Sequence, residues 1–106
     1  MPTYNKLIRD KIPGMVAMTG KVANTKTLSD SEYKKALQKK ANEELTEYLQ
    51  AENVGQALEE LADLLEVIHA LADAHGESFQ AVETIRKKKK EQRGGFEDKV
   101  FLINVE

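Results

Sequence analysis

The sequence contains no cysteine and no tryptophan among its 106 residues. Without cysteine, disulfides, thiolate metal sites and a cysteine nucleophile are excluded, and the composition fits a reducing cytosol. Aromatic residues make up 6% of the chain and hydrophobic residues 41%, so a core must be mostly aliphatic. No apolar run reaches the roughly 18 residues that a membrane-spanning helix needs, and the first ten residues form no apolar signal region. We therefore expect one soluble, cytoplasmic domain over residues 1–106.

An excess of charge of one sign is also missing. The chain has 16 basic and 18 acidic residues, which gives a net charge of −2. This balance offers no electrostatic reason to expect a nucleic-acid polymer or an anionic membrane as a partner. The charged residues are therefore informative through their positions along the chain and not through their sum.

Hydrophobic spacing predicts three long helices. The first is expected to start at Ser29, which stands three residues before Glu32 in the spacing of a capping box. The second, at about 56–75, is apolar around much of its circumference, and Gly76 fits the position just past its end. The third covers about 78–93 and stops at a pair of glycines. The fold class predicted from this pattern is all-α, a small helical bundle.

The two ends of the chain show weaker patterns. Pro13 and Gly14 are expected to end any element that the first residues form. Residues 14–28 are expected to be a loop with at most one short helical turn. Residues 96–106 combine β-branched and aromatic side chains, which is typical of one short strand or an extended arm. We therefore expect the bundle to carry an extended C-terminal arm.

Two segments, EELTE and ELAD, place acids three residues apart inside helical apolar patterns. At about 100° per residue, Glu44 and Glu60 project into the apolar arcs of their helices, and Glu47 and Asp63 lie just beyond the borders. Acids at this spacing are most often solvated helix surface, but a buried ionised carboxylate is costly unless it is compensated. Without cysteine, the compensation that suits converging carboxylates is a hard divalent cation, Mg²⁺ or Mn²⁺.

The third helix carries basic residues on one side. Arg86, Lys89 and Arg93 project close to the direction of Val82, so we expect them to face the bundle. The other lysines of the KKKK run point elsewhere and fit a solvated helix end. Because Mg²⁺ bridges to phosphates, and Arg and Lys donate to phosphoryl oxygens, the combination indicates a phosphate ester or anhydride as the ligand. Structural ion pairing with the acids is the alternative.

EELTE, twelve residues and then ELAD resemble the EExxE…ExxD signature of the MazG-like all-α nucleoside-triphosphate pyrophosphohydrolases. The flanking stretches YNKLIRDKIP, LSDSEY and KKKKEQRGGF resemble the single-domain, phosphoribosyl-ATP pyrophosphohydrolase-like branch, and the resemblance leaves out only residues 14–27. It implies Mg²⁺-dependent cleavage of a nucleoside triphosphate into the monophosphate and pyrophosphate. It also implies a homodimer or homotetramer, with sites near helix interfaces.

The resemblance further implies roles for individual residues. The metal ligands would be Glu44, Glu47, Glu60 and Asp63. The phosphate contacts would come from Lys89 and Arg93, with Arg86 beside them. In the implied mechanism, water attacks a phosphorus while a nearby carboxylate accepts its proton and cations neutralise the developing charge. The catalytic carboxylates would be Glu43 and Glu44, with Glu43 as the base or as an outer-shell group.

Some alternatives stay open at this point. Arg9 and Lys11 are candidates to close the site from the N-terminal arm, but the arm has equal reason to pack through its neighbouring apolar residues. Phosphoribosyl-ATP is the nearest alternative substrate. Glu66 and His69 have the ExxH spacing of di-iron bundles, but those sites need two such motifs, so a packed histidine is favoured. The alternative of another class is a non-enzymatic helical interaction module whose acids form interface salt bridges.

Overall fold

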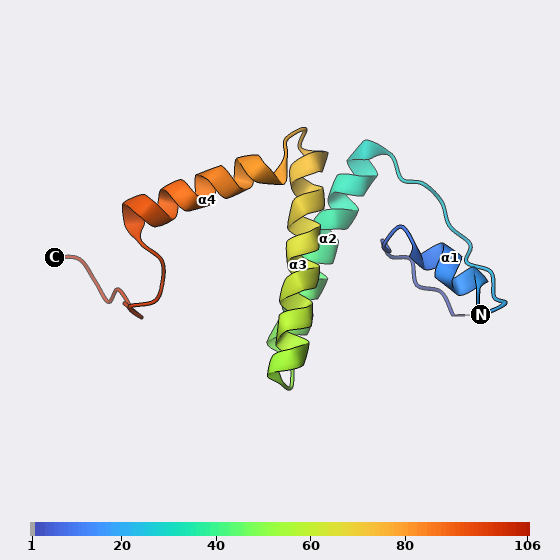
Figure 1. Ribbon diagram of the computed structural model, residues 1–106, viewed down its shortest axis with the longest axis horizontal. Coiled ribbons are helices and arrows are strands. Elements are labelled where there is room, and N and C mark those ends of the chain that lie inside the picture. Colours follow the sequence, from blue (N-terminus) through green and yellow to red (C-terminus); the bar gives the residue numbers. More distant parts are fainter. Residues whose placement is uncertain (1) are drawn as a thin grey trace.

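The computed structural model describes residues 2–106, and its regular elements are all helices. They are, in chain order, α1 (Ile12–Ala17), α2 (Asp30–Leu49), α3 (Val54–Ala74) and α4 (Phe79–Arg93). Figure 1 shows α2 and α3 side by side, with α1 on one side of the pair and α4 leaving it at a steep angle on the other. No strand occurs in the described residues, so the predicted all-α fold is confirmed. Within the same residues, no helix is both long enough and apolar enough to cross a membrane.

Polar caps define where the long helices begin. Ser29 Oγ accepts the Glu32 N–H at 3.2 Å, and the Glu32 carboxylate accepts the Ser29 N–H at 3.1 Å. The predicted capping box is therefore confirmed. Asn53 and Ser78 cap α3 and α4 by accepting a backbone N–H within the first turn. The ends of the second and third predicted helices agree with the structure to within two residues.

The N-terminal expectation about proline is wrong. Pro13 and Gly14 do not end an element, because they lie in the first turn of α1. Proline suits this position, where its fixed φ is helical and its missing N–H has no intrahelical acceptor to lose. At the other end of the chain, residues 96–106 form an arm without regular structure. The extended-arm prediction is therefore confirmed, and the strand alternative is not.

The core is small and lies between α2 and α3. The buried side chains, which are at most 8% exposed, are those of Leu37, Glu44, Val67 and Ala72. Helix α4 buries no residue fully and joins α3 through Phe79, whose ring stacks on His69 with centroids 3.6 Å apart and planes 8° apart. His69 is thus a packed histidine, as favoured from the sequence, while Glu66 is exposed. The α2–α3 pair is therefore the part of the chain that holds a site in place.

Candidate metal centre

Three carboxylates meet where α2 and α3 face each other. Glu44 and Glu47 lie one turn apart on α2, where residues three apart share a face. Glu60 approaches them from α3, and one carboxylate oxygen of each residue lies within 4.8 Å of the other two. The structure thus brings together three of the four acids that were predicted as metal ligands.

The burial of these acids follows the helical projection. Glu44 is 5% exposed and is the only buried charged side chain among residues 2–106. Glu47 is exposed, so the division into inward and border positions is confirmed on α2, whereas on α3 Glu60 and Asp63 are both half-buried. Glu44 Oε2 and Glu60 Oε2 are each buried without a hydrogen-bond partner in the described residues. Unpartnered buried carboxylate oxygens are unfavourable in a folded protein, and a bound cation would satisfy them.

Asp63, the fourth predicted ligand, is held by the N-terminal arm. Arg9 Nη2 donates a hydrogen bond to Asp63 Oδ1 at 2.7 Å, and the two residues are 54 positions apart. Arg9 therefore reaches the edge of the acidic cluster, as suggested from the sequence. Lys11 is exposed at the start of α1 and forms no ion pair with the described acids.

Lys40 also belongs to the site, although it was not predicted. Its Nζ lies 3.6 Å from Glu44 Oε1 and 4.0 Å from Glu43 Oε2. The available signal was its spacing of three and four residues before these acids on one helix, which places all three side chains on the same face. Lys40 gives Glu44 partial charge compensation. The half-buried Glu43 lies on the other side of this contact and is not one of the three converging carboxylates.

Crowding of the acids favours proton binding. Hydrogen bonding with Glu47, and then with Glu44, raises the pKa of Glu60 to about 7, and burial and the neighbouring charges add to the effect. Burial is the main cause that raises the pKa of Glu44, and the charges of Glu47 and Asp63 raise it further, while a hydrogen bond with Glu60 opposes the shift. Without a cation, the raised pKa values of Glu60 and Glu44 favour a bound proton in the cluster, and a divalent ion would have to displace that proton.

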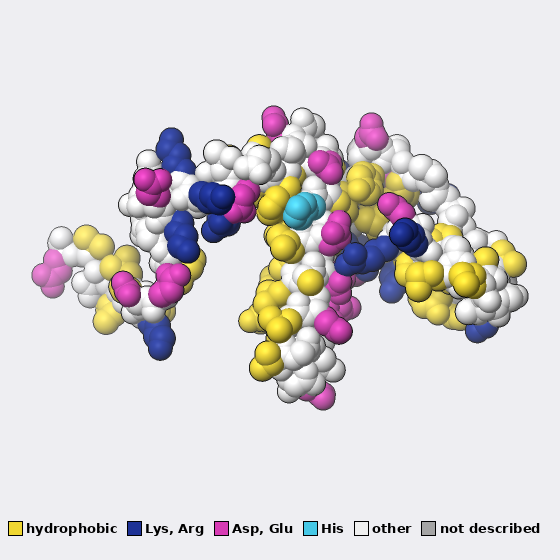
Figure 2. Space-filling model, viewed as in Figure 1, with side chains coloured by type: hydrophobic (Ala, Val, Ile, Leu, Met, Phe, Trp, Pro, Cys, Tyr) yellow, Lys and Arg dark blue, Asp and Glu magenta, His cyan; other side chains and the backbone are white. Residues whose placement is uncertain are grey.

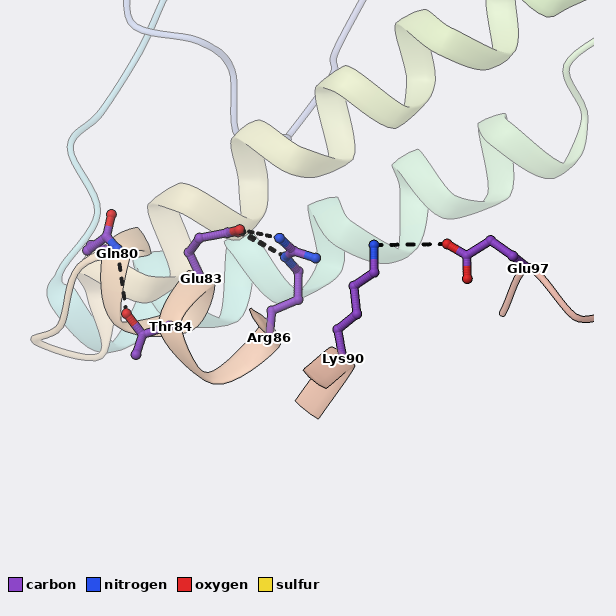
Figure 3. Close-up of polar contacts among 6 residues, drawn as sticks. All are labelled: Gln80, Glu83, Thr84, Arg86, Lys90 and Glu97. Atoms are coloured by element: carbon purple, nitrogen blue, oxygen red, sulfur yellow. Dashed lines mark hydrogen bonds and ion pairs between the residues drawn. The ribbon is translucent and has the colours of Figure 1, made fainter. Parts of the chain in front are cut away.

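The basic residues of α4 lie elsewhere within the chain. Helix α4 contacts α3 and not α2, and Lys89 and Arg93 are exposed. Arg86 pairs with Glu83 on its own helix, with Nε 3.0 Å from both carboxylate oxygens (Figure 3). The expectation that these three residues face the bundle is wrong for a single chain. A helical projection orders side chains around an axis but does not say where the axis points, and α4 points away.

Fold and cluster together define a small all-α protein with a carboxylate site between two antiparallel helices. The chain is similar to an uncharacterized protein of Mycolicibacterium smegmatis, to which it is 41% identical over 54 residues. The match covers 51% of this chain and 55% of the relative, so the chain spans about half the length of that protein. No family model and no solved structure matches the chain. Membership of the MazG-like family therefore stays a prediction.

Proposed function

We propose that this protein is an Mg²⁺-dependent nucleoside-triphosphate pyrophosphohydrolase of the house-cleaning type. One observation carries the proposal: the carboxylates of Glu44, Glu47 and Glu60 converge within 4.8 Å, and two of them keep buried oxygens without partners. The resemblance of EELTE and ELAD to the pyrophosphohydrolase signature supplies the reaction, cleavage into a nucleoside monophosphate and pyrophosphate. The same resemblance supplies the homodimer or homotetramer as the working form.

The donor set of the cluster fits a hard divalent cation. All its ligand atoms are carboxylate oxygens, the type that Mg²⁺ and Mn²⁺ prefer. Glu44, Glu47 and Glu60 would hold the ion, with Asp63 as a further ligand when it is not paired with Arg9. When bound, the ion supplies charge neutralisation at the phosphoryl oxygens of the substrate.

The other residues of the site act on the phosphates and on the attacking water. Glu43 is the carboxylate assigned to accept a proton from water, and its Oε2 lies 4.0 Å from Lys40 Nζ beside the cluster. Arg9, which meets Asp63 at the edge of the cluster, would donate to a phosphoryl oxygen of the bound substrate. Lys89 and Arg93 remain the proposed phosphate contacts, and their place on α4 means that they would serve the site of another copy.

Product analysis tests the proposal. The protein is incubated with Mg²⁺ and with common and modified nucleoside triphosphates and phosphoribosyl-ATP, and the products are separated. We expect at least one substrate to yield pyrophosphate and not orthophosphate. Turnover of phosphoribosyl-ATP alone would instead assign the histidine-pathway reaction. If no substrate is cleaved and calorimetry detects no Mg²⁺ binding, the enzyme proposal is wrong, and the interaction-module alternative replaces it.

A further inference from the structure

The chain exposes much more surface than a folded monomer of its size. Its accessible surface is 9589 Å², whereas a monomer of 11.9 kDa is expected to expose about 5,900 Å². Its radius of gyration is 18.0 Å, against about 13 Å for a compact domain of this length. The excess, roughly 3,700 Å², is larger than the roughly 1,000–2,500 Å² that each partner of an obligate dimer buries. The excess surface is therefore large enough to form the interface of a permanent dimer.

Part of this surface is an apolar groove where α4 leaves α3. The groove has a volume of about 530 Å³, and Leu71, Val82 and Ile85 are among the apolar side chains that line it. Val82 is 39% exposed and Ile85 is 58% exposed, although both follow the helical spacing of a buried face. Figure 2 shows hydrophobic side chains continuing along α3 on the side from which α4 extends. The groove therefore belongs to a longer apolar surface.

The C-terminal tail, residues 96–106, is an apolar segment with nothing packed on it. Phe101, Ile103 and Val105 are 84–88% exposed. In an extended chain, alternate side chains point to the same side, so these three form one apolar edge. Burying each of them would remove a large apolar side chain from water, which is favourable. The tail and the groove are thus both apolar surfaces exposed to water, and packing them together would bury both.

The path of the tail takes it away from the groove of its own chain. The groove lies at the start of α4, and the tail leaves the other end of this 15-residue helix, about 22 Å away. Gly94 turns the chain there with a φ of +82°. Lys90 and Glu97 then form an ion pair at 3.9 Å, which ties the first residues of the tail to the end of α4 (Figure 3). Figure 1 shows the C-terminus as the point farthest from α1.

We propose that the tail of each copy packs into the α3–α4 groove of a second copy, which makes an arm-exchanged homodimer. Phe101, Ile103 and Val105 enter the groove and contact Leu71 and Val82. The exchange is reciprocal, so it closes after two copies and leaves no open end for further growth. It specifies the contact that forms the homodimer of the proposed function, and it holds whether or not the acidic cluster turns over a nucleotide.

Cysteine cross-linking tests the contact, because the chain has no cysteine of its own. A chain that carries Val82→Cys and Ile103→Cys is oxidised and run on a denaturing gel. We expect a covalent dimer as the main product. The matched control combines Val82→Cys with Asn104→Cys, whose side chain lies on the other side of the tail, and it is expected to cross-link at least several-fold more slowly. A disulfide that forms only within one chain, or equal rates for both pairs, overturns the proposal.

Sedimentation equilibrium tests the contribution of the tail to association. Ile103→Asp is expected to weaken the dimer by at least about tenfold, the equivalent of about 1.4 kcal/mol. Asn104→Asp, which adds the same charge one residue along, is expected to change it less than about twofold. Circular dichroism checks that both variants keep their helices. The proposal is overturned if the unmodified protein is monomeric, as it would be if another protein or a membrane covered the groove. It is equally overturned if Ile103→Asp leaves the dimer unchanged.

Discussion

Helices α2 and α3 differ sharply from α4 and the tail that follows it. Among the described residues, all the buried side chains belong to the first pair, and none belongs to α4 or the tail. Yet α4 has the same amphipathic spacing as the pair, with Val82 and Ile85 on its apolar side. The difference teaches that periodicity fixes which side of a helix is apolar but not what covers that side. The α2–α3 pair buries part of its apolar surface and leaves part of it exposed, as at Leu58 and Leu65, while α4 and the tail have no buried residue at all.

The largest expected effect is the loss of stability on truncating a buried side chain of α2, compared with an exposed one of α4. Leu37→Ala removes a side chain that is 3% exposed, so it should lower the free energy of unfolding by about 2–5 kcal/mol. Ile85→Ala removes a side chain that is 58% exposed, and in a monomer it should cost less than about 0.5 kcal/mol. Urea unfolding of both variants at low protein concentration measures the difference.

Repeating these measurements at high protein concentration sharpens the comparison. If a second copy covers α4, the cost of Ile85→Ala should grow with concentration, since the dimer then contributes to stability. The cost of Leu37→Ala should stay constant. Equal costs for the two substitutions at low concentration would show that α4 is packed within one chain, and would remove the distinction between the two regions.

The next effect concerns the site of the α2–α3 pair. Glu60→Gln keeps the shape of the side chain and removes a proposed metal ligand whose oxygen is buried without a partner. We expect Mg²⁺-dependent pyrophosphate release to fall by at least about 100-fold, as for the loss of one preorganised electrostatic contact. Steady-state kinetics measures the loss.

Glu59→Gln is the matched control for this variant. It removes the same charge one position earlier on α3, where the side chain is exposed. It should leave the activity within about twofold, which is the behaviour of a surface substitution. Equal losses in both variants would mean that net charge, and not the cluster, supports turnover.

The sequence was sufficient to predict features that depend on the spacing of residues within one helix. Ser29 and Glu32 form the predicted capping box, and Glu44 and Glu60 point inward, because local spacing sets both. The contact between Arg9 and Asp63 was not predictable as a pair, since it depends on the path of a long irregular segment. The prediction at Pro13 failed because the residue pattern there is ambiguous. Proline both ends and begins helices, and the sequence near Pro13 does not distinguish the two.

The direction of α4 was beyond the sequence as well. Val82 lines the groove beside α3, but Lys89 and Arg93 lie further along α4, which leaves the α2–α3 pair at a steep angle, and both are exposed. The turn between α3 and α4 sets this orientation, and its four residues, 75–78, have no pattern that encodes an angle. A position on a helix is a local property, whereas the partner of that position depends on the whole fold and on its assembly.

A smaller effect is expected in the pH dependence of the metal-free protein. The pKa of Glu60 is raised from its ordinary value of 4.5 to about 7, so the folded state binds this proton more tightly than the unfolded state does. The stabilisation is complete below about pH 4.5 and is lost as the pH rises through about 7. With EDTA present, the melting temperature of the protein should therefore fall relative to that of Glu60→Gln between about pH 5 and about pH 8.

Adding Mg²⁺ at the higher pH should reverse this loss. At a concentration of about 100 times the dissociation constant, binding to the folded state adds about 2.7 kcal/mol. Glu60→Gln should gain less, because it lacks one of the converging carboxylates. A melting temperature that is independent of pH and Mg²⁺ would show that the acids of the cluster titrate independently, as exposed surface acids do.

The smallest expected effect separates the two roles of Arg9. Its ion pair with Asp63 is largely exposed, with 60% of the Arg9 side chain and 40% of the Asp63 side chain accessible. Exposed pairs contribute about 0.2–1 kcal/mol, so Arg9→Ala should barely change the melting temperature. The same substitution frees Asp63, and calorimetry should therefore show unchanged or slightly tighter Mg²⁺ binding. If Arg9 also contacts a phosphate, the KM for the nucleotide should rise in Arg9→Ala while Mg²⁺ binding does not weaken. Arg9→Lys should lower this raised KM only part of the way back, because a lysine cannot make the bidentate contact of a guanidinium. Weaker Mg²⁺ binding in Arg9→Ala would instead mean that the arginine holds Asp63 in position for the ion.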